Sequence, residues 1–470
     1  MSTFLQNIKP WLLTVGLLGL ANFGKALGLE TPKTKKDSTS LSQFFKQGKF
    51  HVQIRSYQSA TLNQQDLSDY YAWGLGGGIG YETPTFFKHF QVRLSGFFMF
   101  NVWSSDLAQA DPLTKQLNRY EVGLFDIEHP SDHQDLDRLE ELLVRYGFGR
   151  KSNLTVGRQM PQTPFINPQD GRMRPTLVEA ATAQLNEWKW FKLTAEYIWR
   201  ISPRSTVRWF DVDQSVGVYP VGVDETGVPS AYKGNLHSKG VGIVGMMYQK
   251  AHWDLQVWNT YFQNVNNTTY TKIEWRSTPI ARRSWMLGLQ ALYQQTIGEG
   301  GNADVTKAYA QPDTKAVVFS GRLGRLSDRV EWYLNATRIT AQGRYLMPRE
   351  WGREPFYTFL PRERNEGFGD VTAFSVNTFF RPEKHTKIEV STGYYHLPDV
   401  RNYVLNKYGM PSYSQVNVGL TYQFDGFWKG LNAQVLVVRK DNLGETYQND
   451  RYVFNKVNMT HLNIIFNYTY

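Results

Sequence analysis

Residues 153–181 read NLTVGRQMPQTPFINPQDGRMRPTLVEAA, and this stretch sets the pattern for the whole chain. Its beginning, up to Gln159, has the alternation of a β-strand. Four prolines follow within residues 160–180, and a second alternating segment comes after them. A hairpin connection usually takes about two to five residues. A proline-stiffened connection of this length therefore indicates a functional loop between two strands.

A period of two also governs residues 91–102 and 413–424. In both segments the even-numbered positions carry mostly apolar side chains, and the odd-numbered positions carry most of the polar ones. Successive side chains of a strand point to opposite faces, so each segment predicts a strand with one apolar and one polar face. Soluble antiparallel sheets share this pattern. The number and spacing of the strands must therefore distinguish a soluble sheet from a membrane barrel.

About eighteen strands can be placed along the chain by this criterion. Short connections lie at residues 149–153, 250–252, 381–385 and 425–430, whereas long connections lie at 104–137, 160–180, 202–238 and 343–368. An even number of strands joined by alternately short and long connections is typical of bacterial outer-membrane barrels. We therefore predict an all-β fold, a transmembrane antiparallel β-barrel. Its expected strands lie near residues 49–60, 70–82, 89–103, 138–148, 152–159, 180–188, 190–201, 239–250, 252–264, 269–277, 284–298, 315–326, 329–342, 369–380, 386–397, 412–424, 429–442 and 458–470.

The composition favours a wall with a polar interior. Aromatic residues make up 15% of the 470 residues, while the mean hydropathy is only -0.46. A barrel with an apolar outside, aromatic girdles and a polar lumen accounts for both values. The chain has no cysteine, which excludes a disulfide framework, a thiol nucleophile and the lipid-bearing cysteine of a lipoprotein. The net charge of +10 favours anionic partners in general.

The beginning of the chain has the order of a secretory signal peptide. Lys9 precedes an apolar run from Trp11 to Leu20, and either of the small residues Ala26 and Gly28 could precede the cleaved bond. A membrane anchor is the alternative, but a spanning helix needs about 20 apolar residues and this run is shorter. Export also argues against a nucleic-acid partner. The expected divisions are a signal peptide (1–28), a polar linker (29–47) and the barrel (48–470).

Two strings resemble a known family. NPQDGRMRPTLVEAA (residues 167–181), placed after VGRQ, is similar to the third loop of the OprD-type outer-membrane porins, the OprD family. In that family the third loop folds into the barrel and meets the seventh loop at a constriction. The last strand, MTHLNIIFNYTY (459–470), resembles the C-terminal assembly signal of outer-membrane barrels. The resemblance implies an outer-membrane porin whose inward-folded third loop (160–180) and seventh loop (343–368) form the constriction.

The same resemblance implies the partners and the solutes. The partners are the barrel-assembly machinery, outer-membrane lipids with lipopolysaccharide, and small anionic solutes. Small hydrophilic solutes that bear carboxylates, such as amino acids, peptides or organic acids, are expected to pass, because arginine is permanently charged and binds carboxylates bidentately. A solvated, salt-bridged surface is the competing interpretation of both loops. The constriction candidates are Asp170, Arg172 and Arg174 in the third loop and Arg349, Arg353 and Arg362 in the seventh.

A second set of cations has the parity of the lumen face. A charge on the lipid face costs about 2–4 kcal/mol near the midplane, so cations in strands are expected to face inward in any barrel. Glu141, Glu196, Glu274 and Glu389 share this parity and could neutralise several of them. Arg158 and Arg338 share the apolar parity, which indicates either a position beyond the hydrocarbon band or a bulge. The predicted basic wall of the lumen consists of Arg55, Arg93, Arg145, Lys192, Arg200, Lys272, Arg276, Arg322, Arg381 and Lys387.

The sequence offers few enzymatic signals. It contains no HExxH pair, no histidine cluster with metal spacing and no GxSxG elbow. The glycines of GLGGGIGYE (74–82) do not match GxGxxG and fit a thin strand. We therefore predict no catalytic residue, no metal and no cofactor. Two alternatives to a porin are a barrel enzyme acting on lipid or peptide, and a closed structural or adhesive barrel.

Overall fold

The computed structural model describes residues 41–470 except 135, 170, 279–282 and 363. The expected signal peptide and Asp170 therefore lie outside the described residues. The described residues divide into two units, with the boundary between Gln47 and Gly48. The first unit contributes the short helix α2 (Leu41–Lys46). No helix in the described part of the chain is both long enough and apolar enough to cross a membrane.

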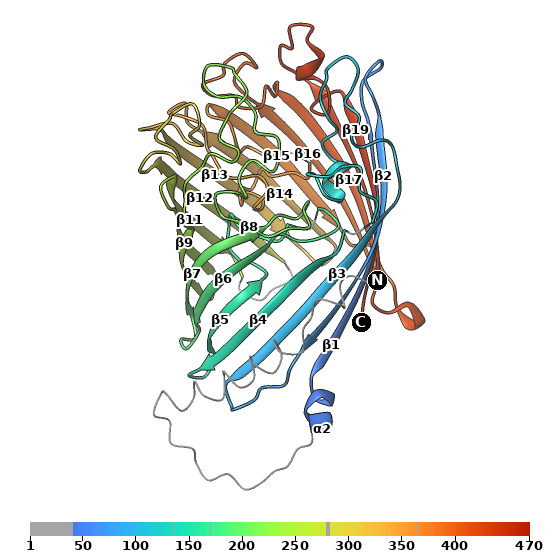
Figure 1. Ribbon diagram of the computed structural model, residues 1–470, viewed down its shortest axis with the longest axis vertical. Coiled ribbons are helices and arrows are strands. Elements are labelled where there is room, and N and C mark those ends of the chain that lie inside the picture. The colour runs from blue at the N-terminus through green and yellow to red at the C-terminus, as the bar shows by residue number, and fades with distance from the viewer. Residues whose placement is uncertain (1–40, 135, 170, 279–282, 363) are drawn as a thin grey trace. The chain divides into compact units, whose positions relative to one another are not determined.

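The second unit is a closed antiparallel barrel, to which the described residues contribute eighteen strands (Figure 1). A further strand of two residues, β8 (Phe210–Asp211), pairs with the end of β7 and is not part of the wall. In the part of the chain that the structure describes, three short 3-10 helices lie in connections, at Val122–Leu124, Gly426–Trp428 and Asp450–Tyr452. The wall strands are β1 (Lys49–Leu62), β2 (Tyr70–Glu82), β3 (Phe90–Ser104), β4 (Arg138–Phe148), β5 (Ser152–Gln159), β6 (Leu177–Leu185), β7 (Phe191–Ser202), β9 (Val241–Lys250), β10 (Trp253–Phe262), β11 (Asn266–Arg276), β12 (Ser284–Thr296), β13 (Lys315–Leu326), β14 (Val330–Ile339), β15 (Val371–Phe380), β16 (Thr386–His396), β17 (Tyr413–Gln423), β18 (Leu431–Asn442) and β19 (Met459–Thr469).

The first and last strands close the barrel. β1 pairs with β19 in an unbroken register that runs from Gln53 opposite Thr469 to Leu62 opposite Thr460. Closure pairs the backbone groups that an open sheet would leave exposed at its edges, which a membrane-spanning sheet requires. The predicted barrel of about eighteen strands is thus confirmed. The sixth strand differs most from its expected range, because pairing with β7 begins at Leu177, directly after the proline-containing part of the third loop.

The wall has an apolar outer face and a polar inner face. In β17, Val416, Val418 and Leu420 are exposed on the outside, whereas Gln415 and Asn417 are fully buried on the inside. The alternation in residues 91–102 and 413–424 therefore assigned the two faces of these strands correctly. An apolar exterior is the surface that a barrel presents to lipid, and the polar interior is the surface that lines its lumen.

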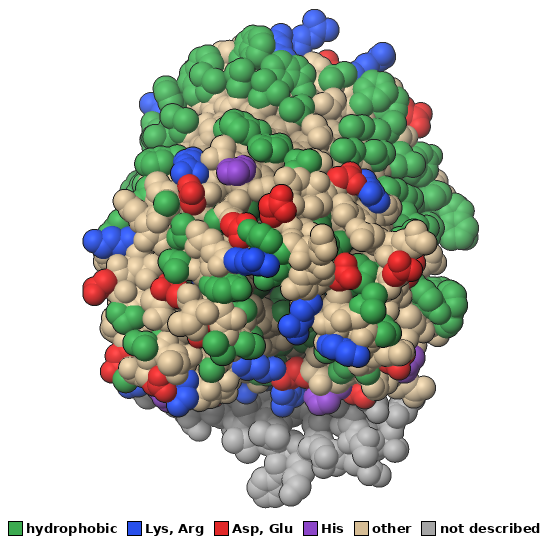
Figure 2. All heavy atoms as spheres, turned by 90° about the horizontal axis from the view of Figure 1, so that it is seen from above, with side chains coloured by type: hydrophobic (Ala, Val, Ile, Leu, Met, Phe, Trp, Pro, Cys, Tyr) green, Lys and Arg blue, Asp and Glu red, His purple; other side chains and the backbone are tan. Residues whose placement is uncertain are grey.

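Long loops lie at one end of the barrel and short turns at the other (Figure 1). Figure 2 views the long-loop end, where apolar side chains gather along the rim and acidic and basic side chains are interspersed across the loops. Two loops at this end are short, the first (63–69) and the fifth (263–265). The longer ones are the second (105–137), third (160–176), fourth (203–240), sixth (297–314), seventh (340–370), eighth (397–412) and ninth (443–458) loops.

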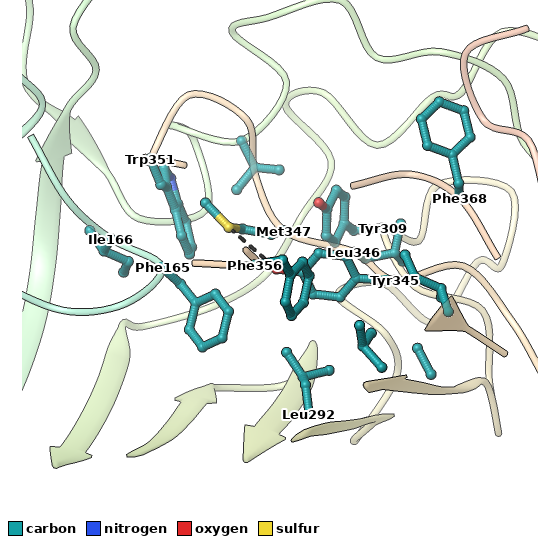
Figure 3. Close-up of a cluster of buried hydrophobic side chains, with 14 of the residues drawn as sticks. Phe165, Ile166, Leu292, Tyr309, Tyr345, Leu346, Met347, Trp351, Phe356 and Phe368 are labelled. Carbon is teal, nitrogen blue, oxygen red and sulfur yellow. Dashed lines mark hydrogen bonds between the residues drawn. The ribbon is translucent and has the colours of Figure 1, made fainter. Parts of the chain in front are cut away.

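The largest hydrophobic core lies where the long loops pack against the inside of the wall. Phe165 and Ile166 of the third loop and Trp351 and Phe356 of the seventh loop belong to one buried cluster with Leu292 of β12 (Figure 3). Each of these side chains is almost completely buried. Removing such aromatic surface from water stabilises the folded loops. The third and seventh loops therefore fold into the barrel and are held there by their own apolar side chains.

Candidate functional site

The third and seventh loops are joined by hydrogen bonds inside the barrel. The Asn167 amide nitrogen Nδ2 donates to the carbonyl oxygen of Arg353 over 2.8 Å, and the backbone N–H of Arg353 donates to Asn167 Oδ1 over 3.1 Å. Thr176 Oγ1 donates to the carbonyl oxygen of Glu350 over 3.1 Å. Asn167 is a good residue for this junction, because its side chain both donates and accepts. The two loops thus form one connected layer.

Gln169 adds a second junction between loops. Its Oε1 accepts from Arg204 Nη1 of the fourth loop over 2.7 Å and from Arg364 Nη2 of the seventh loop over 3.2 Å. Trp351 Nε1 of the seventh loop donates to Ser215 Oγ of the fourth loop over 2.8 Å. Three loops are therefore fixed to one another, and the position of the seventh loop depends on all of these contacts.

The seventh loop is also bonded directly to the barrel wall. Tyr357 Oη donates to Glu274 Oε1 on β11 over 2.8 Å, and Gln294 Nε2 on β12 donates to the carbonyl oxygen of Leu346 over 2.8 Å. On the opposite side of the loop, Tyr395 Oη of β16 donates to the carbonyl oxygen of Thr358 over 2.6 Å. Contacts to both β11–β12 and β16 hold the loop across the lumen instead of against one wall.

A cavity of about 770 Å³ lies between the seventh loop and the wall. The third loop contributes Gln162, Thr163 and Pro164 to its lining, and the seventh loop contributes residues 353–357, 359 and 361. Wall strands from β9 to β16 complete it. Its charged lining consists of Lys272, Arg322 and Arg353 with Glu274, Glu354 and Glu389, and its aromatic lining consists of Trp258, Tyr270, Tyr333, Phe356, Tyr357, Phe359 and Phe379.

The three cations of this cavity differ in what they contact. Lys272 Nζ is paired with Glu274 over 3.3 Å and with Asp254 over 3.4 Å. The Arg322 guanidinium lies over the rings of Tyr333 and Tyr357, and its Nε donates to Asn335 Oδ1 over 2.7 Å. All three Arg322 partners are neutral groups.

Arg353 is the exposed cation of the set, and its guanidinium lies 5.5 Å from the centre of the Phe359 ring. Ion pairing to Glu274 and Asp254 offsets the charge of Lys272. Arg322 and Arg353 are therefore the cations best able to attract an anion into the cavity.

Glu354 is buried beside Arg353, at the edge of the same cavity. Its Oε1 accepts from the backbone N–H and the side-chain Nδ2 of Asn365 over 2.7 and 2.8 Å. Burial raises the pKa of Glu354 to about 7, although these two hydrogen bonds and the nearby Arg364 act in the opposite direction. The charge of the cavity therefore depends on pH near neutrality.

The predicted constriction residues do not all reach the cavity. Arg353 lines it, whereas Asp170 lies outside the described residues. Arg362 reaches the wall and donates to Tyr57 Oη over 2.6 Å. Arg172 is half-buried near Glu121, and its Nη1 donates to the carbonyl oxygen of Gly171 over 2.9 Å.

Arg174 and Arg349 require a correction. Arg174 is 2% exposed and donates to the carbonyl oxygen of Leu136 over 2.8 Å. Arg349 is 8% exposed, pairs with Glu366 over 2.5 Å and stacks on the ring of Tyr408. Burial leaves these two guanidinium groups without the surface that a passing solute needs. Their contacts connect loops, so they support the arrangement of the loops rather than contact the solute.

Most of the predicted basic wall faces the lumen, but the cations are not collected on neighbouring strands. Eight of the ten cations keep the inward parity within paired strands, and a ninth, Arg381, directly follows β15 and pairs with Glu331 on the inner face. The eight are Arg55, Arg93, Arg145, Lys192, Lys272, Arg276, Arg322 and Lys387. They are distributed from β1 to β16. Arg93 is paired with Glu82 over 2.6 Å and with Glu141 over 3.3 Å, and Arg381 with Glu331 over 2.8 Å. Neutralisation by lumen carboxylates, which the sequence left open, thus occurs at Arg93, Lys272 and Arg381.

Arg200 is the exception, and the prediction that it faces the lumen is wrong. A β-bulge at Trp199 changes the register, so that Ile198 pairs with Ala180 while Arg200 pairs with Glu179. Paired residues share a face, and Glu179 lies on the outward side between the buried, inward Val178 and Ala180. Arg200 therefore points outward near the end of β7. A bulge of this kind leaves no reliable signal in the alternation of a single sequence.

Arg158 and Arg338, the two arginines with the parity of the apolar face, also point outward. Arg158 is paired with Glu179 over 2.8 Å and lies over the ring of Trp209. Arg338 is bonded to Asp370 and donates to Thr372 Oγ1 over 3.1 Å, next to the last residue of β14. Both arginines lie near the ends of their strands at the long-loop side and have a carboxylate partner. The strand register is unbroken at both arginines, which argues against a bulge and favours a position beyond the hydrocarbon band.

Sequence reasoning missed several residues that build the site. Tyr357 and Glu354 line the cavity, and Gln169 and Asn167 join the loops. All four lie within the two loops that the sequence singled out, beside the arginines that it favoured. Clustered charge pointed to the arginines, whereas the roles of these four residues depend on partners and burial that the sequence of a loop does not reveal.

The chain is similar to known proteins in sequence and in structure. Residues 144–321 match a family model described as outer membrane porin, OprD family. No curated protein sequence gives a significant match. Among solved structures, Pseudomonas aeruginosa OpdK with vanillate has a TM-score of 0.69 at 14% identity, covering 91% of this chain and 99% of OpdK.

Two further structures are similar to the same degree. Pseudomonas aeruginosa OccK8 (OprE) has a TM-score of 0.69 at 13% identity and covers 91% of this chain and 99% of its own. Acinetobacter baumannii OccAB2 has a TM-score of 0.69 at 13% identity and covers 91% of this chain and 98% of its own. At these identities the structural similarity concerns the fold, and it extends over the complete barrel.

Proposed function

We propose that this chain is an outer membrane porin of the OprD family, whose model matches residues 144–321, and that it passes small hydrophilic, carboxylate-bearing solutes by selective passive diffusion. Its location is the bacterial outer membrane. Diffusion through a lumen requires no covalent step and no cofactor. We also propose that residues 1–28 direct the export of the chain and that the barrel-assembly machinery recognises it.

The preference for carboxylates rests on one observation, the presence of Arg322 and Arg353 on the lining of the 770 Å³ cavity. Arg322 contacts neutral partners, and Arg353 is exposed. A guanidinium group can bind a carboxylate through two parallel hydrogen bonds. The aromatic side chains beside them, Tyr357 and Phe356 among others, offer apolar contact to the remainder of the solute. This combination of a few polar groups on an aromatic lining is typical of small-molecule sites.

The proposed constriction differs from the one that the sequence suggested. Arg353 remains its principal residue in the seventh loop, and Arg362 and Arg172 remain candidates beside the wall. Arg322 and Lys272, expected only as parts of a basic wall, join Arg353 at the cavity. Selection of this kind needs fixed charges at a narrow place, where a solute gives up part of its hydration.

The first experiment is conductance of the purified, refolded chain in a planar bilayer, with the reversal potential measured in a salt gradient. Discrete steps with anion preference support the proposal. Arg353→Gln should lower the ratio of anion to cation permeability by about twofold or more, because it removes one fixed positive charge from the cavity. Lys307→Gln is the matched control, since Lys307 is paired with Asp304 on the sixth loop, away from the cavity.

Vanillate, named with the OpdK structure, is the first solute to try as a blocker of the ion current. Block of the wild-type current that weakens in Arg353→Gln supports recognition of a carboxylate at this site. A folded barrel without conductance steps would contradict the porin function. That result would favour a closed adhesive barrel. Equal anion preference in Arg353→Gln and the wild type would contradict the role of Arg353.

A further inference from the structure

The outer wall of the barrel is hollowed between β11 and β15. A groove of about 490 Å³ lies on the lipid-facing side of these five neighbouring strands. Its floor consists of small residues, Ala291, Gly321 and Ala336. Large apolar side chains border it, among them Leu289 and Phe374, which are 65% and 52% exposed. The small residues thus lower the outer face locally between large apolar side chains.

The strand register explains the groove. Leu289 pairs with Gly321, Gly321 with Ala336 and Ala336 with Phe374, so the four residues form one row across β12–β15. The two small residues lie in the middle of this row and the two large residues at its ends. A Cβ added to Gly321 would have only Leu289 Cδ2 within 4.0 Å, so the space above Gly321 is open.

One cation lines the long-loop end of the groove, and a second lies beyond that end on the same outward face. Arg338 follows Ala336 by two residues on β14, so its side chain leaves the same outward face directly above the small residues. Lys315 begins β13, four residues before Phe319, and shares its outward parity, so it lies about 13 Å beyond the groove lining toward the long loops. Asp370 is bonded to Arg338 and offsets part of this positive charge. In an outer-membrane barrel the long loops are extracellular, so these cations lie near the headgroups of the outer leaflet.

We infer that this groove binds one acyl chain of a phosphate-bearing glycolipid of the outer leaflet, with the phosphate near Lys315 and Arg338. The groove itself is apolar and bordered by Leu289, Phe319 and Phe374, which suits an acyl chain. Basic side chains at the membrane boundary attract anionic headgroups. A lipid joins an acyl chain and an anionic headgroup in one molecule, which matches an apolar groove with positive charge toward the headgroups. The inference rests on the location in the outer membrane and not on the proposed solute.

The test measures lipid bound to the full, refolded chain by native mass spectrometry, with diphosphoryl lipid A and its dephosphorylated form as probes. Gly321→Leu fills the groove with a side chain that the backbone accepts, and it should weaken lipid A binding by about tenfold or more. Gly242→Leu is the matched control. Gly242 faces outward on β9, pairs with the exposed Tyr197 and Tyr261, and has no atom within 4 Å of an added Cβ.

The charge is tested separately by Lys315→Gln, which should weaken binding of diphosphoryl lipid A about fivefold and leave the dephosphorylated form unaffected. Equal lipid A binding by Gly321→Leu and Gly242→Leu would overturn the inference. So would a wild-type chain that associates with itself in the absence of lipid and dissociates on Gly321→Leu. Conductance of Gly321→Leu should match the wild type, so failure of this inference and failure of the porin proposal give different results.

Discussion

At the scale of single residues, burial decides what an arginine does. Arg174 and Arg353 have the same side chain and belong to loops that contact each other, yet one is buried against a carbonyl oxygen and the other is exposed on the cavity. A buried guanidinium joins segments of backbone, whereas an exposed one can attract a solute. Residue type alone therefore does not separate supporting residues from selecting residues.

Glu354 provides a prediction about pH. Because burial raises its pKa to about 7, the carboxyl is neutral in acid and gains a negative charge as pH rises through that value. The folded pKa lies above the ordinary one, so ionisation also removes stability from the loop as pH rises from the ordinary value to about 7. Anion preference should therefore decrease between about pH 5.5 and pH 7.5, as measured by reversal potential.

Glu354→Gln keeps the shape of the side chain and removes its titration. This variant should retain the anion preference of the acidic state across the same pH range, with a smaller change than the wild type. The carbonyl oxygen of the new amide can accept the hydrogen bonds that Asn365 donates to Glu354. If the wild type and Glu354→Gln lose anion preference in parallel, another group controls the effect.

At the scale of elements, the seventh loop behaves as an internal plug with its own anchors. It contacts the third loop through Arg353, the fourth loop through Trp351 and the wall through Tyr357. Its apolar side chains are buried with those of the third loop (Figure 3). A loop held at several independent places narrows the lumen reproducibly, which a loosely tethered segment would not do.

Trp351→Ala should loosen this plug and raise single-channel conductance. Trp351 is 2% exposed, packs on Phe262 with ring centres 4.9 Å apart and donates to Ser215. Removing a buried tryptophan costs about 3–5 kcal/mol, and here the loss falls on the loop and not on the wall. Strand content by circular dichroism should therefore remain unchanged.

Phe427→Ala is a suitable control for Trp351→Ala, since Phe427 is 91% exposed in the turn between β17 and β18. This variant should conduct like the wild type. A Trp351→Ala barrel with intact strands and wild-type conductance would show that the seventh loop does not limit the passage of ions.

At the scale of the whole molecule, the outer and inner faces of the wall differ in how well they tolerate a charged side chain. Val418 of β17 pairs with Val390 and Val437, and all three are exposed on the outside in the middle of the wall. Thr421 lies three residues away on the lumen face and pairs with Lys387. Lipid excludes a charge at the first position, whereas water in the lumen solvates a charge at the second.

Val418→Arg should lower the free energy of unfolding from a bilayer by about 2–4 kcal/mol, the cost of a charge near the midplane. Thr421→Arg should change it far less, although repulsion from Lys387 adds a small cost. Reversible unfolding in urea from lipid vesicles measures both values. Equal destabilisation by the two variants would contradict the assignment of the inner and outer faces.

The candidate site was predictable only in part. The sequence led to the correct loops, because prolines and clustered arginines interrupt the alternation there. It did not distinguish Arg353, which lines the cavity, from Arg349, which is buried beside Glu366. A loop lacks the period-two alternation that shows where each side chain of a strand points. The sequence also missed Tyr357 and Asn167, whose partners are distant in sequence.

The sequence by itself determined the barrel, its strands and the direction of most side chains in the wall. Strand alternation is a local property with a period of two, so it can be recognised in one segment without knowing which strands lie beside it. Only the tertiary structure decided which loop cations face the cavity, where the bulge turns Arg200 outward and how small residues on β12–β14 hollow the outer wall. Each of these depends on register and packing between distant segments, which no local pattern encodes.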